Sequence, residues 1–309
     1  MAGCRLTPPE AVPVDSPLAL EPLQRFQRDH FDLHRHLRSH LGVGPEELEE
    51  RLRQAQQALR DLGEVAFDWD DPEAFYSQTV REEYLYELSA WHEQSADYIG
   101  DTIALERDWA RGEVLDFGGG IGTHAIAAAL LPQVRAVEFV DLNPLHRAFV
   151  AHRVAALALT NVEVGEAPAR SAYDTILCFD VLEHLADPVA QLRRFFELLR
   201  PGGVLICNWY FSKGANGEYP FHLDDPAVVR SFFLHLQLNF IEEFHPHLIT
   251  TRCYRLHPHR RVEGRYMWCA AEALEESTAT TTSPTTAGST QEDTCLLYTS
   301  DAADDLYTV

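Results

Sequence analysis

The sequence predicts an α/β fold, in which strands and helices alternate around a mostly parallel sheet. Short apolar runs recur between residues 114 and 206, amphipathic segments separate them, and a glycine-rich turn joins the first run to the first segment. The chain has 309 residues, of which 46% are hydrophobic and 24% charged, so it can bury a sizeable core. We expect one globular domain of about 200 residues with an extension.

The charge balance narrows the possible functions. The formal net charge is -23 at pH 7, and Lys213 is the only lysine. Because nucleic-acid affinity rests on clustered Lys and Arg, we expect no nucleic-acid partner. No run approaches the roughly 18 apolar residues of a membrane span, and the N-terminus lacks a signal-peptide pattern. With six cysteines and no C-x-x-C pair, the sequence predicts a cytoplasmic protein without membrane insertion.

The first part of the chain predicts helices without strands. Residues 1–20 are proline-rich and aperiodic, which indicates a disordered leader. Apolar positions with helical spacing predict a helix over residues 21–40, and Gly44-Pro45 opens a second helix that Gly63 ends. We therefore assign residues 21–110 to a separate helical segment that precedes the sheet.

A third helix is predicted to begin near Pro72. Its apolar stripe has spacings of four, four, four and three residues, which places all members on one face: Tyr76, Val80, Tyr84, Leu88 and Trp91. One interpretation is that the stripe packs in the core. The alternative is that Tyr76, Tyr84, Trp91 or His92 covers a bound cofactor and substrate.

The glycine-rich stretch is the clearest ligand-binding signal. An apolar run ends in Asp116, glycines follow at alternate positions, and an alanine-rich segment comes next: Gly118, Gly120 and Gly122. Glycine lets the backbone bend sharply and approach a ligand. The pattern predicts a strand, a tight turn and a helix start that cradle a nucleotide. Residues 120–125 also fit the G-x-G-x-x-A form of the dinucleotide fingerprint.

A second carboxylate follows the next predicted strand, residues 136–141. Asp141, beside Leu142, lies about 20 residues past the glycines, where a carboxylate can accept ribose hydroxyls. Several classes of nucleoside-binding enzyme share this feature. It supports a Rossmann-like fold without selecting the ligand, and a helix over residues 145–159 and a short strand at 162–164 follow.

The fourth and fifth strands carry more specific runs. Residues 173–180 are an apolar strand, V-L-E-H-L-A-D-P follows at 181–188, and R-P-G-G at 200–203 precedes the fifth strand. With D-x-G-x-G-x-G at 116–122 and with Asp141, these runs resemble the motifs of class I S-adenosylmethionine (SAM) dependent methyltransferases of the small-molecule type. The resemblance covers roughly residues 111–250, in the right order.

This resemblance implies a seven-stranded, mostly parallel sheet closed by an antiparallel hairpin, here residues 240–244 and 250–256, with the N-terminal helices as a cap. Residues 111–260 would then form the SAM-binding domain. The implied cofactor contacts are Asp116, Gly118, Gly120, Gly122, Asp141, Leu142 and Asp180. Glu166 stands where many such enzymes have an aspartate for adenine, although the loop before the fourth strand is shorter here.

Methyl transfer is an in-line displacement, so the protein mainly aligns the acceptor and excludes water. A hydroxyl or amine acceptor requires a base, and histidine suits that role. His184 and His222 are the candidates, each with the alternative of only lining the pocket or packing a helix start. The predicted wall of the acceptor site is Tyr76, Tyr84, His92 and Tyr210. The H-x-H pairs at 245–247 and 257–259 are interpreted as solvated surface, so no metal site is predicted.

Three functions remain open: a SAM-dependent methyltransferase acting on oxygen or nitrogen of a small molecule, an NAD(P)-dependent oxidoreductase, and a SAM-binding protein without catalysis. The sequence does not predict the oligomeric state. Residues 276–309 are rich in Thr and Ser, which indicates disorder. Residues 295–309 resemble a translated sequencing adapter, typical of an environmental library, and are excluded from the fold.

Overall fold

The computed structural model describes residues 21–215, 217 and 219–271. The predicted leader, residues 1–20, and the predicted tail, residues 276–309, lie outside the described residues. Residues 261–275 gave no expected element; in the described part of that range a two-stranded hairpin is present, formed by β8 (Arg261–Val262) and β9 (Arg265–Tyr266). A short 3₁₀ turn, η4 (Pro258–Arg260), precedes it. Over the described residues, no helix is both long and apolar enough to cross a membrane.

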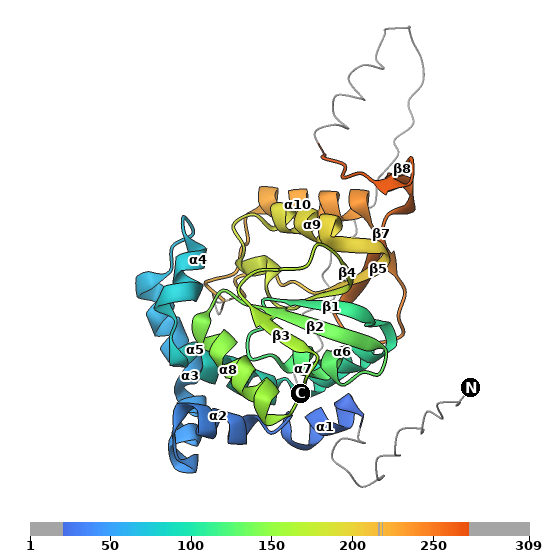
Figure 1. Cartoon of the computed structure of the whole chain (residues 1–309). Helices are drawn as coiled ribbons and strands as arrows, with labels where there is room; N and C mark the ends of the chain where they lie inside the picture. The colour runs from blue at the N-terminus through green and yellow to red at the C-terminus, as the bar shows by residue number, and fades with distance from the viewer. Residues whose placement is uncertain (1–20, 216, 218, 272–309) are drawn as a thin grey trace, which may run out of the picture. The chain divides into compact units, whose positions relative to one another are not determined.

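A seven-stranded sheet forms the centre of the fold, in the order β3-β2-β1-β4-β5-β7-β6 (Figure 1). The strands are β1 (Gly112–Phe117), β2 (Val134–Val140), β3 (Val162–Gly165), β4 (Tyr173–Cys178), β5 (Leu199–Cys207), β6 (Phe240–Glu243) and β7 (Arg252–Leu256). Strands β1 to β5 pair in parallel, and β7 is antiparallel to both β5 and β6. The predicted mostly parallel sheet and its antiparallel hairpin are therefore confirmed.

Helices cover both faces of the sheet. Figure 1 shows α9 (Pro188–Leu198) and α10 (Pro226–Asn239) on one face, with α6 (Ala96–Trp109), α7 (Thr123–Ala129) and α8 (Pro144–Ala156) on the other. Three of these helices begin with a proline after a capping side chain that accepts backbone N–H groups: Asn143, Asp187 and Asp225. Such caps satisfy donors that a helix start leaves unpaired, so the sequence itself sets where these helices begin.

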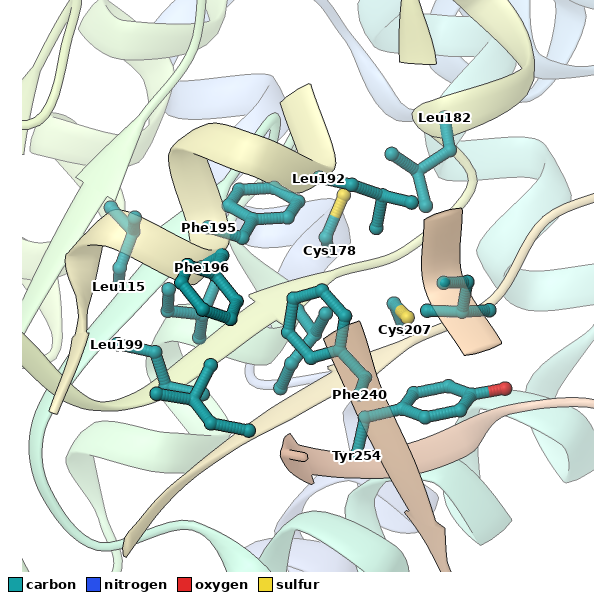
Figure 2. Packing of buried hydrophobic residues seen from close by; sticks show 14 of the residues in the cluster. Leu115, Cys178, Leu182, Leu192, Phe195, Phe196, Leu199, Cys207, Phe240 and Tyr254 are labelled. Carbon is teal, nitrogen blue, oxygen red and sulfur yellow. The ribbon is translucent and has the colours of Figure 1, made fainter. Parts of the chain in front are cut away.

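The core under α9 and α10 is apolar and closely packed. Figure 2 shows Phe195 and Phe196 of α9 lying over the sheet near Cys178, Cys207 and Phe240. Both cysteines are fully buried and free, and burial raises the pKa of each thiol well above its ordinary value. They therefore act as small apolar side chains, which is the usual role of buried cysteine.

The single helix predicted over residues 21–40 is wrong, because two helices are present: α1 (Pro22–Asp29) and α2 (Leu33–Leu41). Three residues between them have positive φ values: His30, Phe31 and Asp32. The buried Arg153 of α8 donates to the carbonyl of His30 at 2.9 Å and to that of Ile121 at 2.7 Å. A side chain distant in sequence thus stabilises this break and links it to the glycine loop. The next helix, α3 (Pro45–Ala66), also continues past the predicted end at Gly63.

The predicted third helix is also interrupted. A short turn, α4 (Pro72–Ala74), leads into a π-helix, η2 (Phe75–Thr79), and α5 (Glu82–Gln94) begins only after a break. Val80 is extended there, with ψ 115°, and its carbonyl accepts a hydrogen bond from Asn143 Nδ2 at 3.2 Å. Because this partner lies after β2, no local pattern in residues 72–91 could reveal the break. Helix α6 was not predicted.

Candidate functional site

The candidate site lies at the carboxyl ends of β1, β2, β4 and β5. The strand order reverses between β1 and β4, and such switch points are where open parallel sheets bind ligands. Four loops leave the sheet at this edge, and α5 of the N-terminal helices contacts the first of them through Leu88. Nearly all residues predicted for the site belong to these four loops or to the segment leading into α5.

The loop after β1 forms the expected tight turn. Gly118 and Gly120 have φ values of 70° and 53°, in the region that favours glycine. A Cβ atom on Gly118 would lie 2.6 Å from Val181 Cγ2, and one on Gly120 would lie 2.9 Å from Leu88 Cδ1. Gly122, with φ 75°, is the N-terminal cap of α7. The loop therefore has neighbours on both sides and leaves no room for side chains.

Asp116 at the end of β1 supports this loop from within. The residue is 1% exposed, and its Oδ2 atom has no hydrogen-bond partner among the described residues. Burial raises the pKa of Asp116 to about 7. A buried carboxylate without a partner is costly unless a positive charge is near. A cationic ligand would therefore stabilise the ionised form of Asp116.

His124, in the first turn of α7, is the nearest cationic group. Its Nδ1 atom hydrogen-bonds Glu106 Oε1 of α6, and both side chains are buried. Although burial opposes the imidazolium charge, Glu106 and, to a smaller extent, Asp116 raise the pKa of His124 above its ordinary value. The pair ties α6 to the helix that begins at the glycine loop.

Asp141 connects the first two loops. Its Oδ2 atom accepts the Gly120 N–H at 3.0 Å, and its Oδ1 atom accepts the Asn143 N–H at 2.7 Å. The side chain is 10% exposed, and His146 Nδ1 lies 3.2 Å from Oδ1. A carboxylate has about four acceptor positions, so capacity for ribose hydroxyls remains. Leu142 beside it is 39% exposed.

Glu166, the residue predicted for adenine, follows β3 and lies at the surface. Its side chain is 70% exposed, and its Oε2 atom lies 3.2 Å from Arg147 Nη2. Arg147 also donates to the carbonyls of Asp141 and Leu142 at 2.7 and 2.8 Å. Exposed ion pairs contribute little stability. A ligand could therefore replace Arg147 as the partner of Glu166 at little cost.

Asp180 follows β4 in a strained backbone conformation, with φ 53°. Its N–H donates to Asn208 Oδ1 at 2.6 Å, and Asn208 Nδ2 donates to Asp180 Oδ1 at 2.8 Å. Asn208 Nδ2 also lies 2.7 Å from the Tyr98 hydroxyl of α6. Burial raises the pKa of Asp180 to about 6. Strained residues held by several partners are concentrated at functional sites.

The two candidate bases lie side by side. The rings of His184 and His222 are 4.7 Å apart and nearly perpendicular. His184 Nδ1 lies 2.9 Å from the Tyr76 hydroxyl and 3.2 Å from the Phe221 carbonyl, and burial lowers its pKa to about 3. His222 Nδ1 lies 2.9 Å from the Tyr210 carbonyl, and burial lowers the pKa of His222 as well. Both imidazoles are therefore neutral near pH 7.

A buried carboxylate adjoins the histidine pair. Glu183 is 1% exposed, its Oε1 atom accepts the Tyr210 N–H at 3.1 Å, and its Oε2 atom has no partner among the described residues. Burial, followed by the charge of Asp180, raises the pKa of Glu183 to about 8. Ligand atoms of Glu183, His184 and His222 lie within 4.8 Å of one another, so this set could hold a metal ion. Two imidazoles and a carboxylate suit a divalent transition metal.

The remaining wall residues fall into two groups. Tyr84 and Tyr76 form a row of aromatic rings. The Tyr84 ring lies 4.9 Å from that of His146 and 5.8 Å from that of Tyr76. The Tyr76 ring lies 5.5 Å from that of His184. This row leads from the Asp141 loop to the histidine pair. His92 instead has Trp91 and His124 as its aromatic neighbours, at 5.2 and 6.2 Å.

Tyr210 belongs to the loop after β5 and lies beside the pair of histidines, His184 and His222. Its ring is 43% exposed and lies 5.8 Å from that of His222. A cavity of about 330 Å³ borders this side of the site, lined by Trp69, Ala186, Lys213, Leu223, Asp224, Asp225 and Val228. Leu223 joins the cavity to the site, because its N–H donates to the Glu183 carbonyl at 2.7 Å.

Sequence reasoning missed four polar residues of this region: Glu87, Glu106, Glu183 and Asn208. Glu183 was noted only as part of the V-L-E-H run. Asn208 directly follows β5, so the rule that ligands bind at carboxyl ends of strands could have found it. Glu87 and Glu106 lie on α5 and α6, whose bounds the sequence did not predict. The H-x-H pair at 245–247 is not simple surface either, since His245 is 8% exposed and hydrogen-bonds the Thr251 carbonyl at 3.0 Å.

Comparison with known proteins identifies relatives of the chain. A family model described as a methyltransferase domain matches residues 53–252. A ubiquinone biosynthesis O-methyltransferase from Xanthomonas campestris is 33% identical over 126 residues, which is 39% of this chain and 51% of the relative. One from Cereibacter sphaeroides is 30% identical over 123 residues, covering 36% of this chain and 50% of the relative. The chain thus spans about half the length of the curated relatives it matches.

Among solved structures, an O-methyltransferase family protein from Burkholderia thailandensis is 16% identical. The match covers 66% of this chain and 70% of that chain, with a TM-score of 0.46.

Proposed function

Since the chain belongs to the methyltransferase-domain family, we propose that it transfers the methyl group of SAM to a hydroxyl oxygen of a small, uncharged acceptor. The observation that carries this proposal is the pair of neutral histidines, His184 and His222, beside the buried carboxylate of Glu183. A neutral imidazole can accept the hydroxyl proton, and burial keeps both rings neutral near pH 7.

The described residues fit SAM as the cofactor. Three glycines with positive φ give the loop the tight turn that nucleotide-binding loops have, and Asp141 retains acceptor capacity for a ribose. The unpartnered carboxylate oxygen of Asp116 suits a ligand with positive charge. When bound, SAM supplies a methyl group already activated by the sulfonium charge.

Each residue near the histidine pair has a defined role in this proposal. Because His222 Nδ1 donates to the Tyr210 carbonyl, the neutral ring carries its lone pair on Nε2, the atom that would take the acceptor proton. Tyr76 and the Phe221 carbonyl hold the ring of His184, which orients the acceptor hydroxyl. Glu183, which is mostly protonated near pH 7, accepts the Tyr210 N–H and so holds the segment whose carbonyl orients His222. The aromatic row and the enclosing loops exclude water, which favours methyl transfer over side reactions.

Two observations favour oxygen as the acceptor atom and an aromatic ring as its carrier. The curated relatives from Xanthomonas campestris and Cereibacter sphaeroides are named O-methyltransferases. Tyr76, Tyr84 and Phe221 provide apolar ring faces near the histidine pair, and aromatic faces pack well against other rings. Burial around Glu183 disfavours an acceptor with negative charge, because a charge that leaves water loses its hydration.

The test is transfer of radiolabelled methyl from SAM to a panel of phenols, catechols and primary amines. We expect transfer to at least one hydroxyl acceptor, and we expect the His222→Asn variant to lower kcat by about 100-fold or more. The His259→Asn variant serves as the control, because His259 is exposed and is on the turn after β7. Transfer to amines only, or a His222→Asn variant with unchanged kcat, would contradict the assignment.

A further inference from the structure

Glu87 shares a face of α5 with two residues that lie at the site, Tyr84 and Leu88. It is three residues after Tyr84 and one before Leu88, and Leu88 contacts the glycine loop at Gly120. Residues three and four apart share a helix face, so Glu87 is in the patch of α5 that faces the loop. Tyr84, on the same helix face, belongs to the aromatic row that leads to the histidine pair, and the negative charge of Glu87 contributes to raising the pKa of Tyr84.

The carboxylate of Glu87 has no partner. No hydrogen bond or ion pair reaches it from residues 21–215, 217 or 219–271, whereas Glu183 and Asp141 each accept backbone N–H groups. The residue keeps some solvent-accessible surface, yet burial alone raises its pKa to about 7. A group that is enclosed without packed polar neighbours is expected to face space that a ligand fills.

The charges around Glu87 are of one sign. Burial raises the pKa of Tyr84 well above its ordinary value, and the negative charges of Glu87, Asp141 and Glu183 add to this effect. These carboxylates come from α5, from the loop after β2 and from the loop after β4. Arg147 is occupied elsewhere, because it donates to the backbone carbonyls of Asp141 and Leu142. An acidic region of this kind favours a ligand that brings positive charge.

We propose that Glu87 is a cofactor-binding residue contributed by the N-terminal helices, whose carboxylate pairs with a cationic group of SAM. The inference rests on the proposed function. SAM carries two such groups, the sulfonium and the ammonium of its methionine part. In this role Glu87 adds a charge–charge contact with the cofactor to the contact that Leu88 of α5 makes with the glycine loop. If the sulfonium is the partner, S-adenosylhomocysteine, which lacks this group, is bound less tightly than SAM.

Calorimetric titration of the full chain with SAM and S-adenosylhomocysteine tests this assignment. We expect the Glu87→Gln variant, which keeps the shape and removes the charge, to bind SAM at least about tenfold more weakly. The Glu87→Asp variant should recover part of the affinity. Glu82→Gln on the same helix is the matched control, because Glu82 is exposed and should leave the affinity unchanged. Thermal unfolding of each variant establishes that it is folded.

The losses of affinity for the two ligands show which cationic group of SAM pairs with Glu87. A loss confined to SAM assigns the sulfonium as the partner of Glu87, and an equal loss for S-adenosylhomocysteine assigns the ammonium; both support the proposal. A folded Glu87→Gln variant that binds SAM within twofold of the parent chain overturns it. Failure of the parent chain itself to bind SAM would instead contradict the proposed function.

Discussion

At the scale of single residues, the site is built from side chains whose protonation is set by burial. The pKa of Asp116 is raised to about 7, that of Asp180 to about 6 and that of Glu183 to about 8, while that of His184 is lowered to about 3. Near neutral pH Glu183 is mostly protonated, Asp116 is partly protonated, Asp180 is mostly ionised, and the imidazole of His184 stays uncharged. The sequence identified Asp116, Asp180 and His184 but could not show these environments, because they depend on neighbours such as Glu106 and Asn208.

The raised pKa of Asp116 gives a prediction for stability. An acid whose pKa is about 7 when folded and near its ordinary 3.8 when unfolded destabilises the fold increasingly as pH rises from about 4 to 7. The Asp116→Asn variant removes this cost, so we expect it to be more stable than the parent by about 2–4 kcal/mol at pH 8 without cofactor. Near pH 4 the two proteins should differ little.

The measurement is thermal unfolding of the parent and the variant at about pH 4 and about pH 8. For a domain of this size the expected gain corresponds to an increase in Tm of roughly 5–10 °C at pH 8. SAM affinity should fall in the same variant if Asp116 serves the cofactor. A variant that melts below the parent at pH 8 would show that the carboxylate is stabilised in the fold rather than strained.

At the scale of elements, the sheet could be predicted and the N-terminal helices could not. Strands β1, β2, β4 and β5 contain buried apolar runs bounded by turns, and the short, half-buried β3 has apolar residues at alternate positions, so local pattern was enough. The order of motifs supplied the hairpin β6 and β7. In contrast, the breaks before Leu33 and after Val80 depend on Arg153 and Asn143. These two side chains come from α8 and from its cap, and each hydrogen-bonds a backbone carbonyl in the break. The local periodicity of the sequence cannot indicate such long-range hydrogen bonds.

The bonds of Arg153 give a prediction for these elements. Its guanidinium donates to the carbonyls of Ile121 and His30, and the side chain is fully buried. The Arg153→Met variant leaves these carbonyls unpaired, so we expect a loss of about 2–4 kcal/mol in the free energy of unfolding. Because Ile121 belongs to the glycine loop, SAM affinity should fall as well. Arg194→Met, at an exposed position of α9, is the control.

Chemical denaturation and calorimetric titration of both variants provide the comparison. A loss of stability without any change in SAM affinity would show that Arg153 supports the helices alone and that the glycine loop keeps its form without it. Equal stability of Arg153→Met and the parent would contradict the role of this residue altogether.

At the scale of the whole molecule, the cap and the sheet meet around one edge, and both contribute to the site. The loops after β1, β2, β4 and β5 bring the acids and the histidines, while α5 and α6 bring Glu87 and Glu106. The predicted residues on the loops lie together because strand ends converge, which sequence order reveals. The contributions of the helices require the packing of α5 against the glycine loop, so they became visible only in the structure.

The measurement that tests this account most directly is a calorimetric titration of the full chain with SAM, S-adenosylhomocysteine and NADH, repeated on the Asp141→Asn variant. We predict binding of the two SAM-type ligands with dissociation constants on the order of micromolar, loss of that binding by at least about tenfold in the variant, and no binding of NADH. Asp141 bonds the Gly120 N–H, so the variant removes a charge from the centre of the proposed cofactor site. Binding of NADH alone would contradict the account.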